Sequence, residues 1–405
     1  MKRLYRIGGS IFFLSIFSVL TWIVLGITLS PEISNVFSVT YPVQFISLLL
    51  LSFFGKASYI RSKREDNKNA VLSGMVLGIG IDLIITIILL IFVDGYIAFF
   101  GLDKNVYRTF TIYAIILEFV KYVFSMILEK MYFEEKDKQA SAFSLIFNIL
   151  SFASVVITSL VTKNQLTIII VGLVPIGLFV LYLFFKQLAK FRLDFNIVSN
   201  FKYESSNVLC FTVMFATYFF GYGNAFKFGN EYVVALNFVN LISDAQWDSF
   251  EAVSTAAKID ITSGTYNHKK SVINSSLFSS SVILITICAY FGFYKIFNVD
   301  YKIGLIFLLV QAIDMMLSPL YYGFDTFIQL EYSPTQNTAN HLIGYIVRFA
   351  IGTFVQNGYC VILAQIISSA LMCIHSLTIR FGKYNLEKDG TLSRKTNQKN
   401  ENLTA

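Results

Sequence analysis

The sequence predicts an all-α integral membrane protein with twelve transmembrane helices in two six-helix bundles. Of its 405 residues, 55% are hydrophobic and 14% are charged, and the mean hydropathy is +0.63. A hydrocarbon core of about 30 Å needs about 20 helical residues per crossing, and twelve apolar runs approach that length. The alternation of polar and apolar residues that is typical of a transmembrane β-barrel is missing, so we expect helices to satisfy the backbone.

The first predicted span follows the basic residues Lys2, Arg3 and Arg6, and no small-residue cleavage site comes after it. This pattern predicts an uncleaved membrane anchor and not a signal peptide. We expect the twelve spans at residues 8–30, 39–55, 71–93, 109–128, 141–162, 165–185, 205–222, 232–257, 271–294, 303–322, 337–355 and 359–379.

The Lys and Arg residues are unevenly divided between the two sides of the predicted membrane. The termini and the loops on their side carry 24 of them, and the loops on the other side carry six. The positive-inside rule therefore predicts that both termini are cytoplasmic and that the protein is a multi-pass protein of the cell membrane. This topology accounts for the net charge of +7, and we expect no nucleic-acid partner.

The longest internal connection falls near the middle of the chain and divides six spans from six. The predicted organisation is an N-terminal bundle over 1–185, a linker over 186–204 along the cytoplasmic membrane surface, and a C-terminal bundle over 205–382. A polar cytoplasmic tail without fixed structure is expected over 383–405. No loop is long enough for an aqueous domain.

Two pairs of loops indicate that the halves are repeats. Lys56-Ala-Ser-Tyr-Ile-Arg-Ser-Lys-Arg-Glu-Asp-Asn67 follows the second span of one half, and Ala257-Lys-Ile-Asp-Ile-Thr-Ser-Gly-Thr-Tyr-Asn267 follows that of the other. Glu135 and Glu331 open the second pair of loops. Each half has an even number of spans and begins on the same side, so the repeats are parallel and related by an axis along the membrane normal.

The stretch from Ser254 through Gly264 to Lys270, with Phe53-Phe-Gly55-Lys-Ala-Ser as a weaker counterpart, resembles the multidrug and toxic compound extrusion (MATE) transporters. Lipid-linked oligosaccharide flippases belong to the same larger superfamily. The resemblance implies alternating access between two bundles, driven by protons or sodium. Those exporters usually carry an acid in the first helix, whereas residues 10–30 here have none, so we do not expect coupling through that position.

Three acids lie in the predicted span 232–257. Spacings of four and three residues place Asp244, Asp248 and Glu251 within about 60° of arc on a helix. A charge at mid-membrane costs about 2.5 to 3.5 kcal/mol, so this face predicts an ion-coupling or substrate cavity, with a structural seam against the other bundle as the alternative. The polar stripe consists of Asn237, Asn240, Asp244, Asp248, Glu251 and Thr255.

Neighbouring carboxylates in the membrane disfavour full ionisation. The group is therefore expected to hold a proton or to share a bound cation. Oxygen atoms of Asn240, Asp244 and Asp248 would also suit sodium. Competition between such an ion and a cationic substrate for one site is antiport.

Other charged residues also lie within the predicted spans. Asp82 and Asp314 are candidates for the cavity or for hydrogen-bonded packing roles. Glu118 and Lys121 are three residues apart and are expected to pair on one helix. Arg348 is expected to meet Asp314 or Asp325.

The predicted function is export of small cationic amphiphiles, since the spans hold six acids against Lys121 and Arg348. The alternative is a flippase for lipid-linked saccharides in envelope polysaccharide assembly, with Lys56, Lys258 and Lys269 near its anionic substrate. A membrane enzyme would need a large external loop or a histidine and acid constellation, and neither is visible. We expect a monomer without cofactor, metal or catalytic residues.

Overall fold

The chain is almost entirely helical in the computed structural model. Long apolar runs set the helices, and polar connections end them. The structure describes residues 2–30, 33, 36–67, 69–99, 103–187, 194, 196–295, 299–332, 334–386 and 392–394. Its elements are α1 (Lys2–Thr28), α3 (Val36–Leu50), η1 (Leu51–Lys56), α4 (Ala57–Arg64), α5 (Asn69–Ile91), α6 (Val93–Phe99), α7 (Lys104–Phe133), α8 (Asp137–Val161), α9 (Gln165–Gln187), η2 (Ile197–Asn200), α10 (Phe201–Ala225), η3 (Phe226–Phe228), α11 (Asn230–Thr262), α12 (His268–Phe293), α13 (Tyr301–Phe327), η4 (Ile328–Tyr332), α14 (Pro334–Phe354), α15 (Cys360–Lys383), β1 (Tyr384–Leu386) and β2 (Leu392–Arg394).

Nine helices in the described part of the chain are long and apolar enough to cross a membrane. This makes the protein a multi-pass membrane protein. The predicted spans 205–222, 232–257 and 337–355 coincide with α10, α11 and α14, which are not among the nine. In α14 the apolar part is short, and α11 bears the acidic stripe. The total of twelve spans and the cytoplasmic termini remain predictions.

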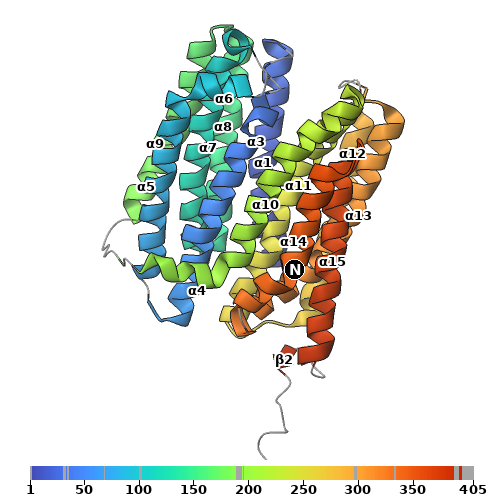
Figure 1. The fold of residues 1–405 in the computed structure, drawn as a ribbon. Helices are drawn as coiled ribbons and strands as arrows, with labels where there is room; N and C mark the ends of the chain where they lie inside the picture. The colour runs from blue at the N-terminus through green and yellow to red at the C-terminus, as the bar shows by residue number, and fades with distance from the viewer. Residues whose placement is uncertain are drawn as a thin grey trace, which may run out of the picture.

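The helices gather in two groups in Figure 1, α1 to α9 on one side and α10 to α15 on the other. In the first group α1 packs on α8, and α7 packs on α3, α5 and α9; in the second, α13 packs on α11, α12 and α15. The groups meet mainly where α1 packs against α11. This arrangement has the shape of the predicted bundles, whose boundaries stay a prediction.

The described part of the predicted linker is held against α4. Arg61 is completely buried and donates to the backbone oxygen of Asn196 at 2.5 Å and to Oδ1 of Asn200 at 3.1 Å, and it forms an ion pair with Asp194. Asn200 donates in turn to the backbone oxygen of Phe53 at 2.9 Å, inside the π-helical turn η1. The expected placement along the membrane surface concerns mostly residues 188–193 and 195, which lie outside the described residues.

The tail was expected to lack fixed structure, and this is wrong for its first part. Tyr384–Leu386 and Leu392–Arg394 pair as an antiparallel two-stranded hairpin directly after α15. Backbone pairing stabilises this polar segment although it has no apolar run of its own.

Glycines on one face of α5 allow this helix to approach η1 and α7 closely. A Cβ atom on Gly74 would overlap the backbone oxygen of Phe54 and the hydroxyl of Ser58. At Gly80, on the opposite face of the helix, a Cβ atom would meet nothing within 4 Å.

Gly74→Ala is therefore expected to destabilise the protein by about 1–3 kcal/mol, because the added methyl group forces α5 away from η1. Gly80→Ala is the matched control on the same helix, and its higher helix propensity predicts a neutral or slightly stabilising effect. Thermal unfolding of the purified proteins in detergent measures both. Equal melting temperatures for the two variants would contradict this packing.

Candidate functional site

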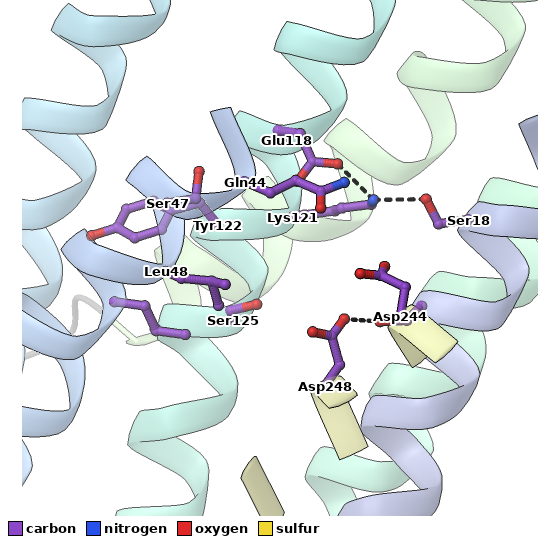
Figure 2. A pocket seen from close by; sticks show the side chains of 12 residues that line it. Ser18, Gln44, Ser47, Leu48, Glu118, Lys121, Tyr122, Ser125, Asp244 and Asp248 are labelled. Carbon is purple, nitrogen blue, oxygen red and sulfur yellow. Dashed lines mark hydrogen bonds and ion pairs between the residues drawn. The ribbon is translucent and has the colours of Figure 1, made fainter. Parts of the chain in front are cut away.

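A cavity lies between helices of the two groups. Ser15 and Ser18 of α1, residues of α3, η1 and α7, and two acids of α11 form its walls (Figure 2). Its volume of about 110 Å³ is roughly that of three to four water molecules. The lining residues are Ser15, Ser18, Gln44, Ser47, Leu48, Leu51, Glu118, Lys121, Tyr122, Ser125, Asp244 and Asp248.

The acids of α11 face the first group of helices across this cavity. Asp244 is buried, and Asp248 accepts a hydrogen bond from the hydroxyl of Ser15 on α1. The 100° turn of an α-helix places both side chains on the face that packs against α1. The structure thus brings these two predicted residues together at the contact between the groups.

The opposite wall contains the predicted pair of α7. Nζ of Lys121 lies 2.7 Å from Oε1 of Glu118 and donates to the hydroxyl of Ser18 at 2.9 Å. Figure 2 shows this ammonium group between α7 and α1, across from Asp244. Since Lys121 and Glu118 balance each other, the carboxylates of α11 give the cavity its negative character.

Three neutral polar side chains complete the walls. Gln44, Ser47 and Ser125 line the cavity, and none of them makes a hydrogen bond to another described residue. Each can donate and accept a hydrogen bond. They therefore offer hydrogen-bonding positions to whatever occupies the cavity.

Below the cavity, charged side chains of both groups form a buried network. Glu251 does not line the cavity, because its Oε2 lies 2.9 Å from Nζ of Lys56 at the end of η1. Lys258 of α11 pairs with Glu204 of α10 at 2.8 Å, and both are buried. Glu129 of α7 interacts electrostatically with both lysines. Removing one partner of such a buried pair typically costs about 3–5 kcal/mol.

Further contacts tie α11 to the first group toward the end of the molecule that holds the N-terminus. Arg3 of α1 pairs with Asp260 at 3.1 Å, and the hydroxyl groups of Tyr59 and Thr262 lie 3.2 Å apart. Residues 244 to 262 of α11 therefore run from the cavity wall, through the buried network, to this end. We call the contacts of Lys56, Tyr59 and Arg3 with α11 the interbundle lock.

Asp82 lies behind the cavity wall and not in it. It is buried in α5, its charge interacts with those of Glu118 and Tyr122, and its Oδ2 has no hydrogen-bond partner. This position fits the predicted interior role, although the side chain is separated from the cavity by α7.

Asp314 lies in a separate polar cluster of the second group. Its Oδ2 accepts from Nε2 of Gln365 at 2.6 Å, and its charge interacts with that of Arg348. Asn240 is buried but does not line the cavity. Asn237 belongs to α11, and its side chain lies outside the described residues.

Sequence reasoning missed the neutral half of the cavity. Ser15 and Ser18, like Gln44 and Ser47, are three residues apart on apolar helices, and Ser125 follows Lys121 by four. These spacings place each pair on one helical face, which was the available signal. Among the described residues, no three His, Cys, Asp or Glu side chains are grouped as a metal site.

Comparisons with known proteins identify the fold. Neither a protein-family model nor a curated protein sequence matches the chain. An outward-facing multidrug resistance MATE family transporter of the MOP superfamily is similar in structure, with a TM-score of 0.68 and 15% identity, over 94% of this chain and 95% of the other. A MATE structure in the bent conformation gives a TM-score of 0.68 and 14% identity over 94% of both chains. A MATE complex with MaD5 gives 0.67 and 16% over 94% and 95%.

The predicted resemblance is therefore confirmed at the level of the fold. Superposition extends over nearly the whole length of both chains, so it includes all the helices that form the cavity and the interbundle lock. The chain has the fold of the MATE transporters.

Proposed function

We propose that the protein is an ion-coupled antiporter that exports small cationic amphiphiles by alternating access between two bundles. The observation that carries this proposal is the cavity between α1, α3, α7 and α11, whose negative character comes from Asp244 and Asp248. A carboxylate pair at a contact between two helix groups can bind one cation at a time and transmit its occupancy to both groups. The MATE fold supports transport and not catalysis.

Asp244 and Asp248 hold either the coupling ion, a proton or sodium, or the cationic head of the cargo. Binding of one releases the other, because two cations in so small a space repel each other at low dielectric. Ser15 connects this event to α1 through its hydrogen bond to Asp248.

The interbundle lock closes one side of this pathway. Lys56, Tyr59 and Arg3 join the first group to α11 below the cavity. With the orientation predicted from the basic loops, this side is cytoplasmic, and the cavity would exchange its contents on the outer side. The similarity to a transporter in an outward-facing conformation supports this assignment.

The alternative, flipping of lipid-linked saccharides, has less support. An anionic diphosphate needs cationic side chains that are available to it. Lys121 pairs with Glu118, Lys56 with Glu251, and Lys258 with Glu204. Of the lysines considered for this role, Lys269 is exposed at the surface and away from the cavity.

The acidic pair can be tested in liposomes with a fluorescent alkylamine and imposed proton or sodium gradients. Asp244→Asn and Asp248→Asn are expected to reduce gradient-driven uptake at least tenfold, because a neutral amide neither releases a proton nor attracts a cation. Asp94→Asn is the control, since Asp94 pairs with Arg108 on the surface. Wild-type uptake by Asp244→Asn under both gradients would disprove the coupling role, and movement of a lipid-linked saccharide alone would favour the flippase.

The lock can be tested by reversing a charge pair. Lys56→Gln is expected to widen the separation of the two groups at this end, because it leaves Glu251 buried without its partner. The double variant Lys56→Glu with Glu251→Lys should restore the wild-type separation. Spin labels on cysteines at the exposed positions 63 and 270 report this distance by double electron–electron resonance. An unchanged distance in folded Lys56→Gln protein would contradict the lock; Arg108→Gln serves as the surface control.

A further inference from the structure

The chemistry of the cavity walls bears on which cations they can hold. Ten of the twelve lining residues have polar side chains, and the two apolar ones are Leu48 and Leu51. Tyr122 contributes the one aromatic ring of this lining, and Figure 2 shows its hydroxyl group directed away from the acids of α11. The walls therefore present many hydrogen-bond acceptors and little aromatic surface.

Two kinds of cation place different demands on a binding site. Quaternary and delocalised cations have no polar hydrogen to donate, and proteins hold them against the faces of several aromatic rings. Primary and secondary ammonium groups instead donate short, strong hydrogen bonds to carboxylates and hydroxyl groups. An acceptor-rich wall without an aromatic cage satisfies the second kind and leaves the first without partners.

Lys121 shows how these walls satisfy an ammonium group. Its Nζ is held by a carboxylate oxygen of Glu118 at 2.7 Å and by the hydroxyl of Ser18 at 2.9 Å. The same two kinds of acceptor recur elsewhere in the cavity, as the carboxylates of α11 and the hydroxyl groups of Ser47 and Ser125. A second primary ammonium group would find the same coordination there.

We propose that this cavity selects cations that carry N–H donors, namely primary and secondary amines, over quaternary or delocalised cations of equal charge. Asp244 and Asp248 supply the charge that attracts the cation, and Gln44, Ser47 and Ser125 supply the hydrogen bonds that distinguish between the two kinds. The inference rests on the proposed function, because it assumes that cargo occupies this cavity. The small volume favours a compact ammonium head.

Ethanolamine and choline are a matched pair of probes, since both carry one positive charge and one hydroxyl group and differ in three N-methyl groups. Their affinities for the full-length protein in nanodiscs can be measured by isothermal titration calorimetry without any gradient. We expect ethanolamine to bind at least tenfold more tightly than choline. Glucosamine, a primary amine larger than choline, controls for size and is also expected to bind more tightly than choline.

The neutral side chains provide the decisive variants. Ser125→Ala and Gln44→Leu are expected to weaken ethanolamine binding about threefold to tenfold each, the usual effect of losing one hydrogen bond, and to leave choline binding unchanged. Ser280→Ala is the control, because Ser280 is exposed and bonds only within α12. A variant that weakened both probes equally would indicate a structural effect and would count against selection by these groups.

The outcomes separate this inference from the transport proposal. If ethanolamine binds selectively but no gradient drives its movement through liposomes, the selectivity stands and the transport proposal fails. If transport of amines occurs and choline binds as tightly as ethanolamine, the selectivity is wrong and the transport proposal stands. Failure of every probe to bind would overturn the selectivity as well.

Discussion

The cost of placing charge in a membrane is the constraint on which the rest of this structure depends. Asp244, Asp248 and Glu251 occupy one face of α11, and no favourable arrangement exposes that face to lipid. The helix must therefore turn this face toward other protein. It packs against α1 of the other group, where Ser15 bonds Asp248 and Lys56 meets Glu251. The contact between the two groups is thus fixed by the acids of a single helix.

Along that face the charges are treated in two ways. Glu251, like Glu204, has a lysine within 3 Å, and a neutralised pair in a buried place stabilises a particular arrangement of helices. Asp244 and Asp248 instead line a cavity whose one lysine is already held by Glu118. A surplus of negative charge beside open volume is a state that a cation can change. The difference in pairing therefore divides α11 into a structural part and a responsive part, one helical turn apart.

Much of this could be predicted because hydropathy and helical period are local properties. The apolar runs gave most of the helices, the 100° turn placed Asp244 and Asp248 together, and the spacing of three paired Glu118 with Lys121. The partner of Glu251 is 195 residues away, and nothing local indicates that Lys56 would reach it.

Other features escaped prediction for different physical reasons. Serine in a transmembrane helix costs little, because its hydroxyl can bond to the backbone of its own helix, so Ser47 and Ser125 give no signal of the kind that a carboxylate gives. Arg61 was counted as an ordinary basic loop residue, although it is fully buried and anchors the linker through Asn196 and Asn200. Such anchoring depends on where a distant segment folds, which the period of a helix does not contain.

The rigidity of α11 gives the proposed mechanism its coupling. Asp248 and Glu251 are three residues apart, and consecutive helical residues rise 1.5 Å, so the cavity and the lock are separated by about 4.5 Å along one axis. A helix with intact backbone hydrogen bonds moves as a unit over that distance. A cation that binds Asp248 and weakens its bond to Ser15 removes one of the contacts between α11 and α1, and the remaining contacts of the lock must then hold the groups together alone. Because Lys56 and Arg3 act on the same helix as the cavity acids, occupancy of the cavity changes the stability of the lock without any other moving part.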